Sequence, residues 1–141
     1  MATIRHLAIR TEDPEKLANF YINVFGFKDL HRGSHPGHPG RKTVHLTDGY
    51  FELAILDNTE QQSPNGLYHF GIQVDNMEET LDRVRKHAPE KKIKKRPDGT
   101  PFAETRVADP DGNFMDISVH GFMDYKPLTQ RNKIPKRDSS R

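Results

Sequence analysis

Two stretches, RHLAIRTEDPEKL at residues 5–17 and YHFGIQVDNMEET at residues 68–80, share one layout. Each places a histidine on a short apolar run, follows the run with polar residues, and continues into a helical pattern. The two stretches begin 63 positions apart, and the same offset relates the Asp-Gly pairs of TDGYFELAIL (47–56) and PDGNFMDISV (110–119). The chain therefore contains one module twice, and this repeat is the basis for predicting the fold.

Each module begins with a strand and continues into a capped helix. In the first module Asp13 is a good N-cap, Pro14 suits the first helical position, and Gly26 ends the helix. In the second module Asn76 is the cap and Pro89 stops the helix. Three strand-like segments follow each helix, at about 27–32, 42–47 and 50–56 in module one and 92–96, 103–108 and 113–119 in module two. Each module is therefore predicted to be β-α-β-β-β, which indicates an α+β fold.

Side-chain alternation along the strands predicts an apolar face and a polar face. The apolar residues, which should pack under the helices, are Leu7 and Ile9; Phe51, Leu53 and Ile55; Phe70, Ile72 and Val74; Met115, Ile117 and Val119. The helices offer matching stripes, which are Leu17, Phe20, Tyr21, Val24 and Phe25 in one and Met77, Leu81, Val84 and Ala88 in the other. The polar face carries one metal-competent residue on each of four strands, His6, Glu52, His69 and Asp116. Because the two pairs occupy matching places in the modules, one shared curved sheet would bring all four together in a cup lined by small residues.

These residues are where a family resemblance enters. The chain resembles the vicinal oxygen chelate superfamily, which includes glyoxalase I, methylmalonyl-CoA epimerase, fosfomycin-resistance enzymes, extradiol dioxygenases and bleomycin-resistance proteins. The resemblance covers roughly residues 3–120 and rests on IRHLAIRTEDPEKLANFYINVFGF, YHFGIQV and ADPDGNFMDIS. It implies two tandem βαβββ modules that form one curved mixed sheet around a metal-binding cup, with the helices on the outer face. The family's ligand positions match His6, Glu52, His69 and Asp116; the last is commonly glutamate, and the shorter Asp116 bears on metal affinity and coordination number.

The ligand set predicts the chemistry of the cup. Two imidazoles and two carboxylates suit one divalent ion (Zn, Ni, Co, Mn or Fe) with water in the remaining positions. A substrate with two neighbouring oxygens could displace that water, and the metal would then stabilise an enediolate or oxyanion. Either Glu52 or Asp116 is the candidate catalytic base that removes a proton next to the carbonyl.

Strand phase also predicts residues that could contact a substrate. The candidates are His45, Glu104 and Arg106, with Arg10, Gln73 and Tyr50 as weaker ones. Arg106 could hold an anionic group, and His45 or Glu104 could relay a proton. An internal salt bridge between Arg106 and a neighbouring acid is an equally good interpretation.

The most conspicuous histidines lie elsewhere. The stretch HRGSHPGHPGRKTVH (31–45) holds four of the eight histidines in the chain. Its glycine and proline content predicts a flexible connection over 33–40 between the second and third strands of module one. Of the four histidines, only His45 is expected to point into the cup.

Composition narrows the class of protein. The net charge of +2 argues against binding to nucleic acid through phosphate contacts, and the absence of cysteine excludes thiol chemistry. No apolar stretch is long enough to span a membrane, so a soluble, cytoplasmic protein is expected. One domain over 1–123, with modules at about 3–57 and 66–120, would precede a polar basic tail at 124–141. The basic run KKIKKR (91–96) is interpreted as an exposed edge strand guarded by lysines.

Three functional hypotheses follow. The first is a glyoxalase-like, divalent-metal-dependent isomerase, epimerase or lyase acting on a small molecule, which the resemblance implies is a homodimer. The second is a binding protein of the bleomycin-resistance kind without turnover. The third is an extradiol-type dioxygenase, which would need only three ligands.

Overall fold

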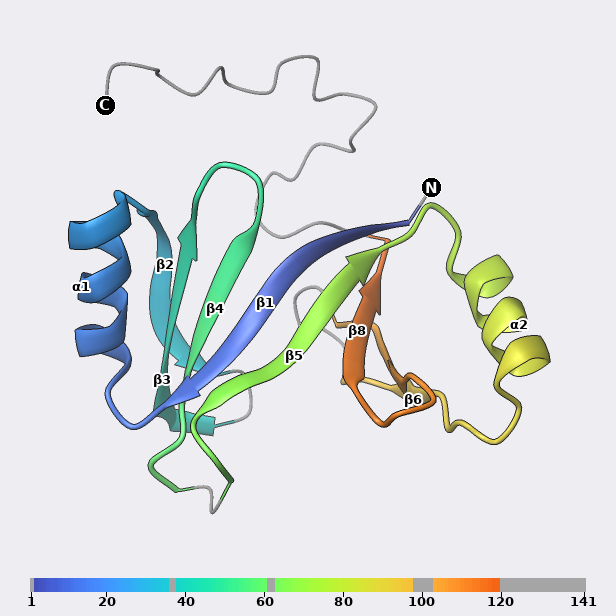
Figure 1. Cartoon of the computed structure of the whole chain (residues 1–141). Helices are drawn as coiled ribbons and strands as arrows, with labels where there is room; N and C mark the ends of the chain where they lie inside the picture. Colours follow the sequence, from blue (N-terminus) through green and yellow to red (C-terminus); the bar gives the residue numbers. More distant parts are fainter. Residues whose placement is uncertain (1, 36–37, 61–62, 98–102, 120–141) are drawn as a thin grey trace.

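The computed structural model describes residues 2–35, 38–60, 63–97 and 103–119, and these form one eight-stranded mixed sheet with two helices (Figure 1). The strands are Thr3–Thr11 (β1), Lys28–His35 (β2), His38–Thr47 (β3), Glu52–Asp57 (β4), Gly66–Gln73 (β5), Lys94–Lys95 (β6), Thr105–Ala108 (β7) and Phe114–Ser118 (β8). Their order across the sheet is β2-β3-β4-β1-β5-β8-β7-β6.

This order is the product of an internal repeat. In each module the first strand pairs in parallel with the last, β1 with β4 and β5 with β8. The modules meet where β1 and β5 pair antiparallel at the middle of the sheet. Each module therefore contributes half of one curved sheet, and the predicted tandem βαβββ architecture is confirmed.

The two helices, Pro14–Phe25 (α1) and Met77–His87 (α2), begin at the predicted caps. The Asp13 carboxylate accepts a hydrogen bond from the backbone N–H of Lys16 (3.0 Å), and the Asn76 side chain accepts one from Glu79 (3.0 Å). Gly26 ends α1 in the left-handed conformation, at φ 71°, which glycine adopts without the steric cost of a Cβ.

Each module has its own hydrophobic core beneath its helix. In module one α1 packs on β3 and β4, and the buried residues are Ala18, Val44, Leu46, Leu53 and Ile55. In module two the buried residues are Val74, Val107 and Ile117, with Met77 and Val84 of α2 packed against them. The helices therefore lie on one face of the sheet, and the opposite face is left for the site.

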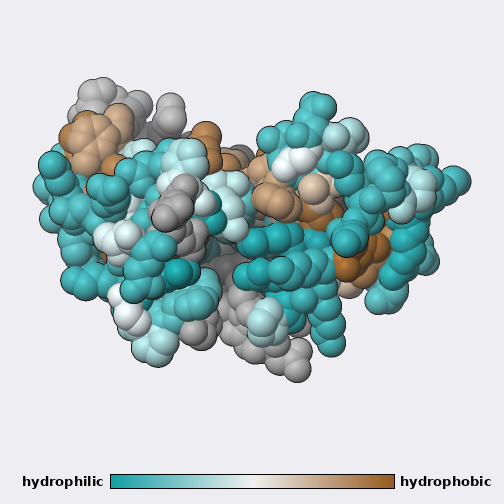
Figure 2. Space-filling view, turned by 90° about the horizontal axis from the view of Figure 1, so that it is seen from below, coloured by the Kyte–Doolittle hydropathy of each residue, from teal (hydrophilic) through white to brown (hydrophobic). Residues whose placement is uncertain are grey.

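The predicted apolar stripe of α1 is wrong for three residues. Phe20, Val24 and Phe25 are 51%, 54% and 58% exposed, whereas Ala18 is completely buried. The helix approaches the sheet through the small Ala18 and through Leu17, which turns the three larger residues outward. Seen from below, the surface is largely hydrophilic, with several apolar patches (Figure 2).

The histidine-rich stretch is more regular than predicted. β2 continues to His35 and β3 begins at His38, so most of the expected loop at 33–40 lies in strands, and residues 36–37 lie outside the described residues. β2 is an edge strand, and β3 pairs with β4 only from Thr43 onward. Pro39 thus lies where the sheet is only two strands wide, a position that tolerates the loss of a backbone donor.

The far edge of module two is shorter than predicted. β6 comprises only Lys94 and Lys95, paired with Arg106 and Thr105 of β7, and it is the last strand of the described sheet. The predicted basic tail at 124–141 lies outside the described residues. Among the residues that the structure describes, no helix is both long and apolar enough to cross a membrane.

Candidate metal centre

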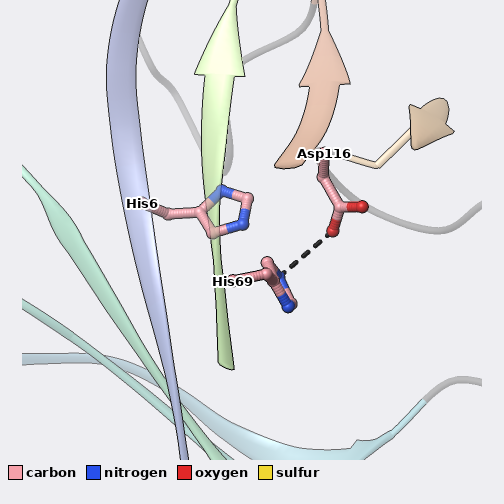
Figure 3. A group of neighbouring side chains, drawn as sticks. All are labelled: His6, His69 and Asp116. Atoms are coloured by element: carbon pink, nitrogen blue, oxygen red, sulfur yellow. Dashed lines mark ion pairs between the residues drawn. The ribbon is translucent and has the colours of Figure 1, made fainter. Parts of the chain in front are cut away.

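Three of the four predicted ligands converge on the sheet face opposite the helices, here called the cup face. His6 of β1, His69 of β5 and Asp116 of β8 each offer a ligand atom, and these atoms lie within 4.8 Å of one another (Figure 3). Strand register explains the convergence, because Gly71 of β5 pairs with His6 on one side and with Asp116 on the other. The three central strands thus place two imidazoles and one carboxylate around one point.

The glycine at the centre of this row has a specific function. A Cβ at Gly71 would lie only 2.0 Å from Cε1 and 2.1 Å from Nδ1 of His6. The His6 ring therefore occupies the space that any other residue at position 71 would fill. Gly71 permits the imidazole to lie across β5 toward Asp116.

Burial keeps His6 in the form that binds metals. The side chain is buried, and this burial together with the neighbouring His69 lowers the pKa of His6 to about 4. A metal ligand must be the neutral imidazole. His6 is therefore neutral at physiological pH without help from a metal.

Asp116 contacts two side chains, the imidazole of His69 and the guanidinium of Arg106. His69 Nε2 lies 3.1 Å from Asp116 Oδ2, and Arg106 forms a two-pronged contact through Nε to Oδ1 (2.7 Å) and Nη2 to Oδ2 (3.1 Å). Burial raises the pKa of Asp116, but the hydrogen bonds from His69 and Arg106 outweigh it and hold the pKa well below its usual range. Asp116 is therefore ionised, as a ligand has to be.

The fourth predicted ligand, Glu52, is not part of the converging group. It pairs with His6 in the register of β1 and β4, but its Oε1 is hydrogen-bonded to Nδ1 of His45 on β3. Burial raises the pKa of Glu52, and the contact with His45 only partly offsets this. Its Oε2 is buried and has no hydrogen-bond partner among the described residues. Within the described part of the chain, this oxygen is an acceptor that no donor uses.

The two modules are therefore less equivalent than predicted. In module one the acid pairs directly with the histidine, His6 with Glu52. In module two Asp116 pairs with Gly71, two residues beyond His69. This shift brings Asp116 within reach of both histidines, whereas Glu52 turns toward the edge of the sheet.

The three predicted substrate-binding residues all have partners within the protein. Arg106 forms the internal salt bridge to Asp116 that was one of its two interpretations. Glu104 accepts hydrogen bonds from Ser118 Oγ (3.1 Å) and from the backbone N–H of Val119 (3.0 Å). His45 pairs with Glu52, as described above. Arg106 and His45 thus contact the two carboxylates, while Glu104, directly before β7, contacts the end of β8.

Strict alternation missed one residue of the cup face, Tyr68. Its place in the pattern predicts the opposite face, but β5 has a register shift beside it: His69 pairs with Ala8, and Leu67 pairs with Ile9. At such a bulge neighbouring residues no longer alternate regularly. The Tyr68 hydroxyl accepts a hydrogen bond from Arg106 Nη1 (3.2 Å), and the Arg10 guanidinium lies 3.4 Å from the ring centroid.

Comparison with known proteins identifies the family. Residues 3–117 match the family model described as the Glyoxalase/Bleomycin resistance protein/Dioxygenase superfamily. The chain belongs to this superfamily. None of the curated proteins searched matches the chain.

Solved structures of low sequence identity share the superfamily fold. A hypothetical protein from Bacillus halodurans C-125 has 18% identity and a TM-score of 0.66, covering 82% of this chain and 92% of its own. A methylmalonyl-CoA epimerase from Mycobacterium tuberculosis has 12% identity and a TM-score of 0.64, covering 81% and 85%. A Streptomyces coelicolor methylmalonyl-CoA epimerase variant, in complex with 2-nitronate-propionyl-CoA, has 18% identity and a TM-score of 0.62, covering 82% and 92%.

The residues on the cup face fit the divalent ion that members of this superfamily generally bind. Nitrogen and oxygen ligands about 2.0–2.2 Å from an ion lie roughly 3–4 Å from one another. The ligand atoms of His6, His69 and Asp116 lie within 4.8 Å of one another, so a small movement of these side chains would bring them to that spacing. Nδ1 of His69 is buried without a hydrogen-bond partner among the described residues, as is Oε2 of Glu52. A bound ion is one explanation for buried polar atoms without a partner, so these two atoms are consistent with a metal site.

Proposed function

We propose that the chain is a divalent-metal-dependent isomerase of the epimerase type, acting on a small substrate with two neighbouring oxygens. The observation that carries the proposal is the convergence of His6, His69 and Asp116 on one point of the cup face. The activity is suggested by the structural neighbours that are methylmalonyl-CoA epimerases. Methylmalonyl-CoA is accordingly the first substrate to test.

The proposed division of roles follows from the partners of the two carboxylates. His6, His69 and Asp116 would hold the ion, which would polarise the substrate's carbonyl and stabilise the negative charge that develops on its oxygen. Asp116 has contacts to both oxygens and would stay in place as a ligand. Glu52 has a raised pKa and one oxygen without a hydrogen-bond partner among the described residues, so it is assigned as the base that removes the adjacent proton. His45 would orient Glu52.

The metal part of the proposal is tested by elemental analysis of protein purified without chelators and after reconstitution with Mn, Co, Ni, Zn or Fe. We expect one ion per chain in the wild type and little in His69→Ala and Asp116→Ala. His87→Ala, at the exposed end of α2, is the matched control and should bind as the wild type does. Wild-type protein that takes up no stoichiometric ion from any of the five metals would overturn the proposal.

The catalytic part is tested by proton exchange. In D₂O, the metal-loaded protein should introduce deuterium next to the carbonyl of methylmalonyl-CoA. Mass spectrometry measures this incorporation. Glu52→Gln should lower the exchange rate by about 10²-fold or more while still binding metal. Undiminished exchange in this variant would remove Glu52 from the role of base, and no exchange in the wild type would exclude this substrate.

A second function is favoured by one observation. Arg106 and His69 already contact the oxygens of Asp116 without an ion. This arrangement suits the second function, that of a protein that binds a small molecule without a metal. For such a binding protein, thermal stabilisation by the small molecule would be unchanged by EDTA. For the metal-dependent enzyme, EDTA would abolish it.

A further inference from the structure

Two pairs of histidines face each other across β2 and β3, outside the ligand group of the cup face. In the register of these strands His31 pairs with His45, and His35 pairs with His38. The ring centroids lie 6.0 Å apart in the first pair and 5.3 Å apart in the second. One hairpin therefore arranges four of the eight histidines of the chain as cross-strand pairs.

The two pairs differ in their surroundings. Nδ1 of His45 is bonded to Glu52, so the first pair borders the candidate base. The second pair lies toward the end of the hairpin, beyond Thr43, the first residue of β3 that pairs with β4. His35 is half-buried and His38 is exposed, so the second pair is open to solvent on one side.

The spacing of the second pair suits two ligands of one metal ion. A bond of about 2.0–2.1 Å from an imidazole nitrogen to a metal places the ring centre roughly 3 Å from the ion. Two such rings in neighbouring coordination positions have their centres roughly 4.5–5 Å apart. The 5.3 Å between the rings of His35 and His38 is a small side-chain rotation away from that spacing. Because the strands already hold the two rings close together, little conformational freedom is lost when an ion binds.

Acidic partners offset the charge of the arginines near this end of the hairpin. Arg32 of β2 contacts the carboxylates of Glu15 and Asp29. Nε of Arg41 on β3 lies 3.5 Å from a carboxylate oxygen of Glu60. An incoming cation therefore meets less repulsion from these two guanidinium groups than their charge alone would cause.

We propose that His35 and His38 form a second metal site, which binds Cu²⁺ with water in the remaining positions. Imidazole nitrogen suits copper, and among the divalent first-row ions Cu²⁺ binds a given set of ligands most tightly. The other ions bind two imidazoles more weakly, so protein freed of excess Mn, Co, Ni, Zn or Fe keeps only the ion of the cup face. The second site does not depend on the proposed isomerase function, and its ion would tie β2 to β3.

The site is tested by titration with Cu²⁺, first in protein that lacks a cup-face ligand. Cu²⁺ is added to Asp116→Ala and to the same variant with His35→Ala or His38→Ala. His31→Ala in this background is the matched control, because it removes a histidine of the other pair in the same hairpin. Calorimetry measures stoichiometry and affinity, and the EPR spectrum of the bound ion reports its nitrogen ligands. The wild type and the single variant His38→Ala are titrated as well, and near-UV circular dichroism confirms that each protein is folded.

We expect the wild type to bind two Cu²⁺ ions and Asp116→Ala to bind one. Either His35→Ala or His38→Ala should weaken binding of that remaining ion at least tenfold, whereas His31→Ala should leave it unchanged. In the wild-type background, His38→Ala should reduce the stoichiometry from two ions to one.

The results for the two metal sites can be told apart. Unchanged Cu²⁺ affinity in both His35→Ala and His38→Ala would overturn the hairpin site, as would an equal loss in His31→Ala. A wild type that binds one ion, with none bound by Asp116→Ala, would also overturn it and leave the cup-face site in place. A single ion that Asp116→Ala keeps and His38→Ala loses would support the hairpin site and count against the cup-face site.

Discussion

At the scale of single residues, the site combines groups whose ionisation is set by their neighbours. His6 is neutral because burial and His69 disfavour its charged form. Asp116 is ionised because Arg106 and His69 stabilise its charge, and Glu52 holds its proton more strongly because it is buried. Two carboxylates with opposite pKa shifts are typical of a site in which one acts as a ligand and the other moves a proton.

The shift of His6 predicts a pH dependence of stability in the metal-free protein. Its folded pKa of about 4 lies below the unfolded value of 6.5, so the unfolded chain binds the proton first as the pH falls. Above pH 6.5 the ring is neutral in both states, and the protein has its full stability. As the pH falls from 6.5 toward 4, protonation of His6 in the unfolded chain lowers the free energy of unfolding by about 3 kcal/mol.

Urea unfolding in EDTA at several pH values, for the wild type and His6→Gln, measures the contribution of His6. As the pH falls through this window, the free energy of unfolding of the wild type should decrease more than that of His6→Gln. A difference independent of pH would show that His6 does not titrate with a lowered pKa.

The contact between Arg106 and Asp116 predicts a strong coupling. Both side chains are largely buried, at 13% and 4% exposed, so removal of either partner leaves an unbalanced charge. We expect Arg106→Gln to destabilise the metal-free protein by about 3 kcal/mol. The double variant Arg106→Gln/Asp116→Asn should lose clearly less than the sum of the single variants, as measured by urea unfolding. Additive losses would mean that the two groups do not interact energetically.

At the scale of strands and helices, irregularities limited what could be predicted. Alternation placed His6, His69 and Asp116 on one face because the pairing is regular over the short stretch from His6 to Ala8 of β1, and from there across β5 to β8. It misplaced Tyr68 because the bulge in β5 is set by pairing with β1, which no local pattern reveals. The partners chosen by Glu52 and Asp116 depend on side-chain rotamers and on the two-residue difference in register. The outward turn of α1 depends on the small Ala18, which a search for large apolar residues overlooks.

The close approach of β1 and β5 leads to a test at Gly71. Gly71→Ala places a methyl group where the His6 ring lies, so the ring must move. We expect a loss of about 1–3 kcal/mol in stability and a metal affinity lowered by tenfold or more, measured by unfolding and metal titration. Gly40→Ala in β3 is the control, since a Cβ there meets nothing within 4 Å. Equal effects of the two variants would exclude a specific role for Gly71.

At the scale of the whole molecule, two separate hydrophobic cores are joined through the pairing of β1 with β5. His6 belongs to one module, whereas His69 and Asp116 belong to the other. A bound ion would therefore link the two halves of the sheet directly. Such a link would make the overall stability of the protein depend on the metal.

Metal binding should raise the melting temperature. At a free metal concentration 100 times the Kd, the gain is about 2.7 kcal/mol, which for a chain of this size corresponds to a rise of roughly 8 °C. Differential scanning fluorimetry with and without EDTA measures it, and Asp116→Ala should show almost no rise. A similar rise in Asp116→Ala would mean that the ion binds elsewhere, for example at the histidines of β2 and β3.

The unequal register of the two modules has a consequence for stereochemistry. A cup with true two-fold symmetry would accept a substrate in two equivalent orientations, with the same groups above and below it. Here one half presents a carboxylate backed by His45, and the other presents a carboxylate backed by Arg106. We therefore expect a bound molecule to adopt a single orientation, so that the two sides of a planar, deprotonated carbon meet different chemical surroundings.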